Sequence, residues 1–296
     1  MPRLAKNQLK IKHFWLCRHY LKNHNEKFAK ICQIGYNNTN AFFWRRFNLD
    51  FFTFGDNMDV ITNPLGMFSL QHLLTLLFFF IVGIILVKRY KSPELQSTLR
   101  RQMAIAILFL EVIRQVVLLV TNSHAWEFLP LHLCAFGVHL ILIDAYFENK
   151  YTKEVIFMLT LPGALAALIT PDWANNPLIN FFTIQSFSIH ALMVIYAIMR
   201  LKAGELSLHV KNIWMPTTFL FGITPLIMGI NHLLDTNFFF LTTGPEGTPL
   251  AALQSQFGGF YISSLALLFF IVWLIMYFLL GIRQKFIATE PELREV

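Results

Sequence analysis

The sequence predicts an all-α fold, a polytopic membrane helix bundle of about seven transmembrane helices, and three observations support this prediction. Of the 296 residues, 55% are apolar and only 14% are charged, whereas soluble domains carry roughly 25% charged residues. Long apolar runs recur along the chain, and a helix needs about 20 such residues to cross a bilayer. Basic residues gather in every second connection between the runs. A disordered chain and an ordinary soluble domain are therefore excluded.

Seven apolar runs are candidate transmembrane spans. The fourth run is short and contains Leu161-Pro162-Gly163, so we expect it to be interrupted and supported by neighbouring helices rather than facing lipid throughout. The runs cover approximately residues 67–87, 102–121, 129–147, 155–170, 179–200, 212–231 and 259–280.

The connections predict the orientation. Thirteen basic residues lie in segments 88–101, 148–154, 200–211 and 281–296, and none lies in 122–128, 171–178 or 232–258. Because basic connections stay in the cytoplasm, we expect a multi-pass protein of the cell membrane with a cytoplasmic C-terminus.

The N-terminal segment carries the whole net charge of +7, since residues 1–57 contain ten basic and three acidic side chains and the rest of the chain is neutral. Seven spans with a cytoplasmic C-terminus would place this segment outside, against the charge rule. We therefore divide the chain into an extension (1–57), a seven-helix domain (58–281) and a short tail (282–296), and expect translation to start at Met58. The alternative is an interfacial amphipathic segment over residues 41–54. Nucleic acid is not an expected partner.

Polar side chains inside the spans predict a cavity. Such side chains are costly in lipid and normally face the bundle interior. Counted at 1.5 Å per residue, they gather in the half of the bundle predicted to be extracellular, and the other half contributes almost nothing comparable. This distribution predicts a cavity open to the outer leaflet or the extracellular side. Its candidate residues are His72, Glu111, Arg114, His132, Cys134, His139, His190, Asn231, His232, Asp235 and Asn237.

Two alternatives remain open for several of these residues. Glu111 and Arg114 are three residues apart, so they can form a structural ion pair on one helix face, or Arg114 can meet a phosphate or carboxylate of a substrate. His132 and His139 share a stripe of the third span, and His139 matches His190 in depth. These histidines are either interhelical hydrogen-bond partners or part of a site.

Cys134 is the only thiol after the extension. With Pro130 expected in the first turn of its helix, Cys134 lies near a helix N-terminus, where a thiolate is favoured. A histidine from another span is the better base, because His132 lies two residues away on the same helix and points elsewhere. The alternative is an inert small hydrophobic side chain.

Several chemistries lack their motifs. HExxH, GxSxG and a Gly-rich phosphate loop are absent from the sequence, and the seventh span has no lysine. We expect no metal and no cofactor. Haem ligation by the intramembrane histidines and a zinc site in the extension are alternatives that no spacing favours; the zinc candidates are His13, Cys17, His19, His24 and Cys32.

Four motifs carry a resemblance to a known family. They are Phe128-Leu-Pro-Leu-His-Leu-Cys134, the stretch from Gly163 to Asp172, the segment Phe181 to His190, and Ile230-Asn231 through Thr236-Asn237. Together they resemble the YwaF-like bacterial integral membrane family, which is related to the eukaryotic transmembrane protein 164. The resemblance covers about Gly66 to Gly281 and leaves out the extension.

The resemblance implies a lipid acyltransferase. Cys134 would be the nucleophile that takes an acyl chain as a thioester and passes it to a lysophospholipid hydroxyl, with His190 or His72 as the base. Membrane lipids are then the expected partners. The expected substrate-binding residues are Glu111, Arg114, His132, His139, Asn231, His232 and Asn237. The alternative is a non-enzymatic transporter or receptor whose polar intramembrane cavity binds a small solute or a proton.

Overall fold

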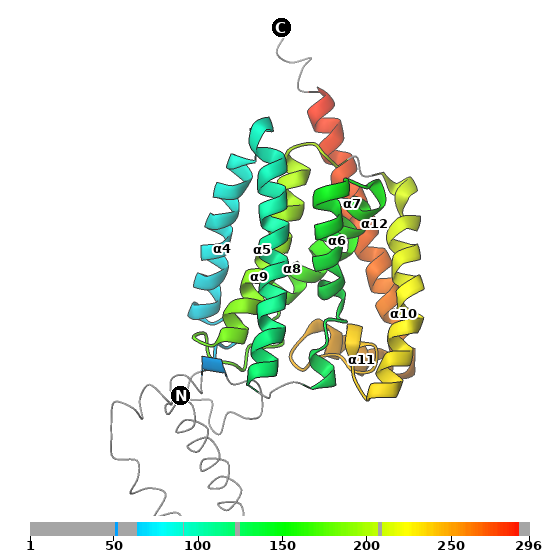
Figure 1. Ribbon diagram of the computed structural model, residues 1–296. Coiled ribbons are helices and arrows are strands. Elements are labelled where there is room, and N and C mark those ends of the chain that lie inside the picture. Colours follow the sequence, from blue (N-terminus) through cyan, green and yellow to red (C-terminus); the bar gives the residue numbers. More distant parts are fainter. Residues whose placement is uncertain (1–50, 53–63, 91, 122–124, 207–208, 290–296) are drawn as a thin grey trace, which may run out of the picture. The chain divides into compact units, whose positions relative to one another are not determined.

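The computed structural model describes residues 51–52, 64–90, 92–121, 125–206 and 209–289 (Figure 1). The expected start at Met58, nearly all of the segment 41–54 and the zinc candidates of the extension lie outside the described residues. The chain divides into two units, residues 1–51 and 52–296. The membrane helices belong to the second unit, whose described part is helical and contains no strand.

The predicted membrane bundle is confirmed. Seven segments among the described residues are long and apolar enough to span a membrane, and they follow the seven expected runs. The last helix continues to Thr289, past the expected boundary at 281. The helices are α4 (Leu70–Arg89), α5 (Pro93–Val120), α6 (Leu133–Phe147), α7 (Lys150–Val155), α8 (Leu161–Ile169), α9 (Phe181–Lys202), α10 (Trp214–Leu234), α11 (Pro249–Phe257) and α12 (Tyr261–Thr289).

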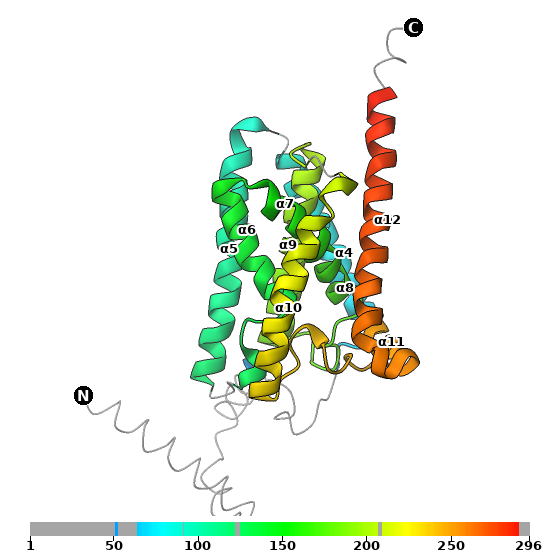
Figure 2. The same ribbon diagram turned by 90° about the vertical axis from the view of Figure 1, so that its right-hand side faces the viewer.

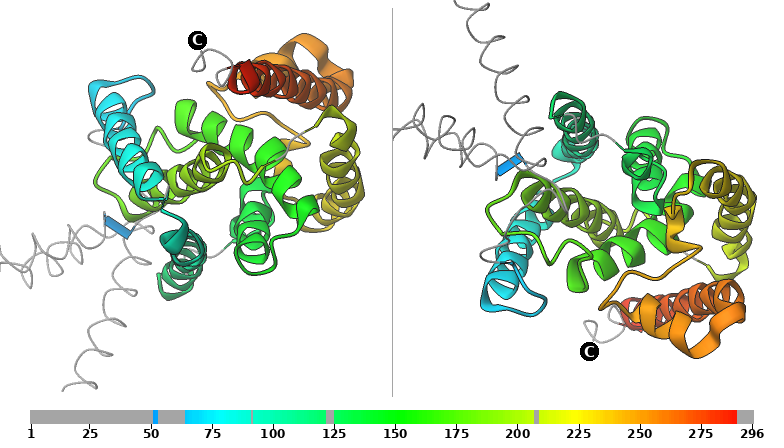
Figure 3. Two further views of the ribbon diagram at one scale, coloured as in Figure 1. Left: turned by 90° about the horizontal axis from the view of Figure 1, so that it is seen from above. Right: turned by 90° about the horizontal axis from the view of Figure 1, so that it is seen from below.

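Two segments form the centre of the bundle. In the most apolar stretch of the α7–α8 segment and of α9, 61% of the residues are buried, whereas the corresponding share in α4 is 11%. Seen along the bundle, α9 lies between α4, α5, α6 and the α7–α8 segment (Figure 3). The outer helices can therefore turn an apolar face to lipid, while the central ones must satisfy their polar groups within the protein.

The fourth span is interrupted, as predicted. A π-helical turn, Ile156–Thr160, separates α7 from α8. Pro162 has no N–H, so the carbonyl of Met158, four residues earlier, loses its α-helical donor. Trp273 Nε1 of α12 donates to that carbonyl over 2.7 Å, and Tyr277 of α12 donates to Glu154 over 2.6 Å. The interruption is thus where α12 attaches to the bundle.

The same turn lies very close to α6. A Cβ atom at Gly137 would lie only 2.6 Å from Thr160 Cγ2, so no larger residue fits without movement. Small residues let membrane helices approach in this way, because close packing rather than the hydrophobic effect holds them together in lipid.

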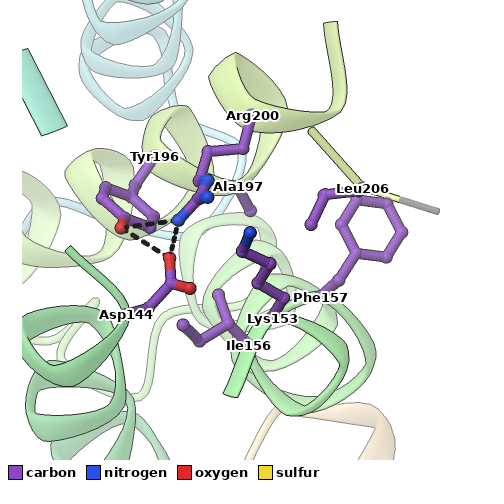
Figure 4. Close-up of a pocket in the computed structure, with 8 residues that line it drawn as sticks. All are labelled: Asp144, Lys153, Ile156, Phe157, Tyr196, Ala197, Arg200 and Leu206. Carbon is purple, nitrogen blue, oxygen red and sulfur yellow. Dashed lines mark hydrogen bonds and ion pairs between the residues drawn. The ribbon is translucent and has the colours of Figure 1, made fainter. Parts of the chain in front are cut away.

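A buried ionic network joins the helices at the end of the bundle that carries the basic connections, here called the basic end. Arg200 of α9 pairs with Asp144 of α6, and their side chains are 2% and 1% exposed. Tyr196 donates to the same carboxylate over 2.7 Å, so the three side chains converge (Figure 4). A cavity of about 10 Å³ adjoins them, about the volume that one water molecule requires.

The network extends to two further helices. Glu205 lies 2.8 Å from Arg200 Nη2 and 3.4 Å from Arg100 Nη1, and it accepts a hydrogen bond from Tyr90 over 2.5 Å. Arg100 also pairs with Glu148. Ion pairs and hydrogen bonds therefore join α4, α5, α6 and α9 at the basic end.

This network corrects one expectation from the sequence. The sequence predicts that polar side chains inside the spans lie almost only in the half of the bundle opposite the basic end. That prediction is wrong, because the basic end also buries charged side chains. Arg200 was counted as a residue of a basic connection, whereas α9 continues to Lys202 and carries Arg200 inside the bundle. Only helix packing brings Asp144 to it.

Arg200→Met should lower the free energy of unfolding by about 3–5 kcal/mol, because it leaves Asp144 buried without its cation. The control is Lys202→Met, an exposed position of the same helix, which should change stability by less than about 0.5 kcal/mol. Unfolding of the purified protein in mixed micelles measures both. Equal losses in the two variants would contradict the assignment.

Gly137→Ala should cost about 1–3 kcal/mol of stability, because the added methyl overpacks the contact with Thr160. At Gly222, in contrast, an added Cβ meets nothing within 4 Å. Gly222→Ala should therefore be neutral or stabilising, since alanine is the better helix former by about 1 kcal/mol. Thermal unfolding of the two variants compares them, and a stable Gly137→Ala protein would show that the close approach is not required.

Candidate functional site

A cavity of about 860 Å³ lies toward the end of the bundle opposite the basic end. Its volume is within the range of small-molecule sites. Side chains of α5, α6, α8, α9, α10, α11 and α12 line it, together with the connections before α6, after α8 and after α10. Its polar lining includes Glu111, Arg114, His132, Cys134, Asp172, Gln185, Ser186, His190, Asp235 and Asn237.

Cys134 lines this cavity from the first turn of α6. Pro130 was expected inside that turn, but α6 begins at Leu133, with His132 as the preceding cap residue. Cys134 is therefore the second residue of the helix, closer to its N-terminus than expected, where the helix dipole favours negative charge. The thiol is free. A Cβ at Gly163 would lie 3.9 Å from Cys134 Sγ, so this glycine leaves space beside the sulfur.

His190 lines the same cavity from α9 with one ring nitrogen available. Its Nδ1 lies 2.7 Å from the carbonyl oxygen of Ser186. A carbonyl only accepts, so Nδ1 carries the hydrogen, and Nε2 of the neutral ring keeps its lone pair. Trp173 stacks on the ring at a centroid distance of 5.2 Å and holds its orientation. His190 is thus arranged as a proton acceptor.

His72 is arranged differently. It is fully buried and does not line the cavity. Its Nε2 lies 2.8 Å from the carbonyl oxygen of Leu168, and its Nδ1 accepts the backbone N–H of Phe68 over 3.0 Å. Both nitrogens are engaged, and His72 connects α4 to the end of α8.

The remaining histidines divide into two groups. His132 lines the cavity, and its ring contacts those of Phe238 and Phe240 at 5.2 and 5.1 Å. His139 and His232 are outside the lining; His139 bonds only along its own helix, at 3.0 Å from the oxygen of Ala135. Within the described ranges, no three His, Cys, Asp or Glu side chains are grouped so that they could hold a metal ion.

Glu111 and Arg114 form the ion pair that their spacing permits. Arg114 Nη1 lies 3.2 Å from Glu111 Oε1, and Gln115 donates to the same oxygen over 2.8 Å. Both charged side chains also line the cavity. Arg114 interacts electrostatically with His190 and Asp172, so its charge belongs to the polar part of the cavity as well as to the pair.

The two asparagines shape the connection that closes this end of the cavity. Asn231 accepts the N–H of Phe238 over 2.8 Å and donates to its carbonyl over 3.0 Å. Asn237 binds the next turn through Thr243, at 2.8 Å from its carbonyl oxygen. Tyr261 of α12 donates to the carbonyl of Phe240 over 2.9 Å. Asn231 therefore holds the connection in place without lining the cavity, whereas Asn237 lines the cavity.

Asp172 and Trp173 are cavity residues that are not among the candidates from the sequence, although Asp172 ends one of the four family motifs. They lie in the connection after α8, whereas counting depth along a helix selects mainly residues inside the spans. Their position directly after the fourth span was the available signal. Asp172 is accessible from the cavity, but the surrounding protein raises the pKa of its carboxyl group, and the nearby charge of Arg114 opposes that rise.

Asp172→Asn should make the protein more stable at neutral and alkaline pH. Because the folded state raises the pKa of Asp172, stability falls as pH rises from the ordinary aspartate pKa through the raised value. The variant lacks this loss, and the difference should vanish at pH values below the ordinary pKa, where both states are protonated. Thermal unfolding in detergent across a pH series measures it. Identical pH profiles for the two proteins would contradict the raised pKa.

Comparisons with known proteins agree with the motifs found in the sequence. Residues 67–277 match the model of the TMEM164 family, which spans α4 to α12 and includes the whole cavity. No curated protein and no solved structure matches the chain. Since the match covers more than half of the sequence, this multi-pass membrane protein belongs to the TMEM164 family.

Proposed function

We propose that this protein transfers acyl chains between membrane lipids, with Cys134 as the nucleophile and His190 as the base. The observation that carries the proposal is that a free thiol and an imidazole with an available Nε2 line one cavity. Cys134 is partly exposed and lines the cavity, so a base in the same cavity can take the proton of its thiol. Thiol and imidazole together are the groups that covalent acyl transfer requires.

The proposed reaction has two halves. In the first, Cys134 gives its proton to His190 Nε2 as the sulfur attacks the acyl carbonyl of a donor phospholipid. The C–S bond forms, the C–O ester bond breaks, and the leaving lysophospholipid oxygen takes the proton. In the second, His190 removes the proton of an acceptor lysophospholipid hydroxyl, the oxygen attacks the thioester, and the sulfur leaves and recovers its proton.

The charged residues of the cavity suit a phospholipid head group. Arg114 has five N–H donors, so it can keep its pair with Glu111 and still bind a phosphate oxygen. His132 and Asn237 line the same region and can donate to ester or phosphate oxygens. The proposal needs no cofactor.

The proposed setting is the cell membrane, with the basic end in the cytoplasm. The thirteen basic residues of segments 88–101, 148–154, 200–211 and 281–296 support this orientation. The cavity would then serve the outer leaflet.

The test is acyl transfer by the purified full chain in vesicles. The donor is phosphatidylcholine with an isotope-labelled acyl chain, and the acceptor is lysophosphatidylethanolamine. We expect a hydroxylamine-sensitive adduct on Cys134 and labelled phosphatidylethanolamine, and Cys134→Ala should lose both. Cys32→Ser is the matched control, because it removes a thiol of the extension and should leave both signals unchanged.

His190→Gln should lower the transfer rate by about 10²–10⁴-fold, the usual contribution of a general acid–base group. His209→Gln, at an exposed position, is its control and should keep the rate of the parent protein. Absence of both the thioester and labelled product from the parent protein would reject acyl transfer. Saturable solute uptake that survives Cys134→Ala would instead favour the transporter alternative.

A further inference from the structure

We infer that an acyl chain of a membrane phospholipid lies along α12 inside the cavity and reaches it sideways from the bilayer, through the seam between α10 and α12. The inference deepens the proposed function, on which it rests for the fate of the chain, by naming where the lipid binds and how it arrives. Four observations support it.

The first is the apolar part of the cavity that runs along α12, here called the arm. Its wall on α12 consists of Ile262, Leu265, Ala266, Leu268, Phe269 and Val272. From Ile262 to Val272 the helix rises about 15 Å at 1.5 Å per residue, so the arm extends over about that length. The polar groups that line the rest of the cavity come mainly from α5, α6, α9 and the connections, with Thr224 from α10. A long apolar arm joined to a polar region is complementary to an amphiphile.

The second is the exposure of the residues at the seam. On α10, Leu220 is 8% exposed and the adjacent Phe221 is 53% exposed, yet both line the cavity. On α12, Leu265 is 7% exposed and Ile262 is 42% exposed, and both line it too. On each helix the cavity wall therefore continues from buried residues to residues at the outer surface, which faces lipid in a membrane.

The third is the way in which α12 is held. Trp273 and Tyr277 bond to the α7–α8 segment, toward the basic end of α12, and Tyr261 bonds at its opposite end. Between these attachments lies the part of α12 that lines the cavity. Figure 2 shows α11 at the lower end of α12, and α10 to the left of α12. The seam thus lies between two fixed points and can admit a chain without detaching α12.

The fourth is the closed side of the cavity. The connection between α10 and α11 folds across the end opposite the basic end, and Phe239, Phe240 and Leu241 line the cavity from it. Asn231 and Asn237 hold this connection through several hydrogen bonds. An acyl chain arriving from that end would have to displace these bonds, whereas the seam offers apolar side chains to the bilayer.

The test uses phosphatidylcholine with a diazirine group on its acyl chain, present at a low fraction in phosphatidylcholine vesicles that contain the full chain. After illumination, peptide mass spectrometry locates the adducts. We expect labelling of the inward-facing Leu265 and Phe269, saturable with probe concentration. The outward-facing Leu274 and Phe278, which are 53% and 68% exposed, should be labelled without saturation by ordinary bilayer contact.

Ala266→Trp fills the arm from α12 and should abolish the inward labelling while the outward labelling persists. Ser263→Trp is the matched control, because Ser263 is exposed on the same helix outside the lining, and it should label as the parent does. Thr224→Trp fills the seam from α10. It provides a second, independent block of the arm in case Ala266→Trp does not fold. The persistent outward labelling and the elution volume of each variant report its integrity.

The inference is overturned if inward labelling is absent from the parent protein, or if it survives both Ala266→Trp and Thr224→Trp. Labelling of α8 at Ala166 without labelling of α10 would also overturn it, because the chain would then pass on the other side of α12. A diazirine fatty acid that labels the arm when the phospholipid probe does not would reject a phospholipid as the occupant.

The experiment separates this inference from the proposed function. Cys134→Ala should retain inward labelling, because the arm does not depend on the thiol. Labelling without a thioester in the parent protein would reject acyl transfer and keep the lipid site. A thioester that forms equally well in Ala266→Trp and Thr224→Trp would reject the seam and keep acyl transfer.

Discussion

The hydrogen bond from Trp273 to the carbonyl of Met158 is the interaction on which the arrangement of this bundle depends. Inside a bilayer no water is available to satisfy a broken helix, so each freed backbone group needs a partner from the protein. Pro162 frees that carbonyl in the middle of the fourth span, and α12 supplies the donor. The broken span must therefore be buried, and α12 must lie against it. The cavity lies where α12 continues beyond this attachment.

The two ends of the bundle use charged residues in opposite ways. At the basic end, Arg200 and Asp144 are almost completely buried and neutralise each other. Breaking one partner of such a pair costs several kcal/mol, so its charges serve to hold the helices in place. At the other end, Arg114 keeps one pair with Glu111 but also lines a cavity of about 860 Å³. Buried ion pairs thus link the helices at the basic end, and the opposite end has room for a ligand.

The candidate site could be predicted from the sequence only in part. Depth counting selected Cys134 and His190, and both line the cavity. The family resemblance implies His190 or His72 as the base and does not choose between them. The difference lies in their nitrogens, since His72 uses both in hydrogen bonds and His190 leaves Nε2 available. Asp172 was missed because a connection that folds back into the bundle has no signature in hydropathy.

The helical membrane class, the seven spans, the break at Pro162 and the family follow from the amino-acid sequence. These depend on local properties, namely the length of apolar runs, the geometry of proline and short motifs. Which polar residues contact one another depends on the packing of the helices. Asp144 and Arg200 are 56 residues apart along the chain, and neither sequence position indicates a partner on another helix. Pairing across helices depends on how each helix is rotated and packed, and the apolar patterns of lipid-facing helices leave that rotation undetermined.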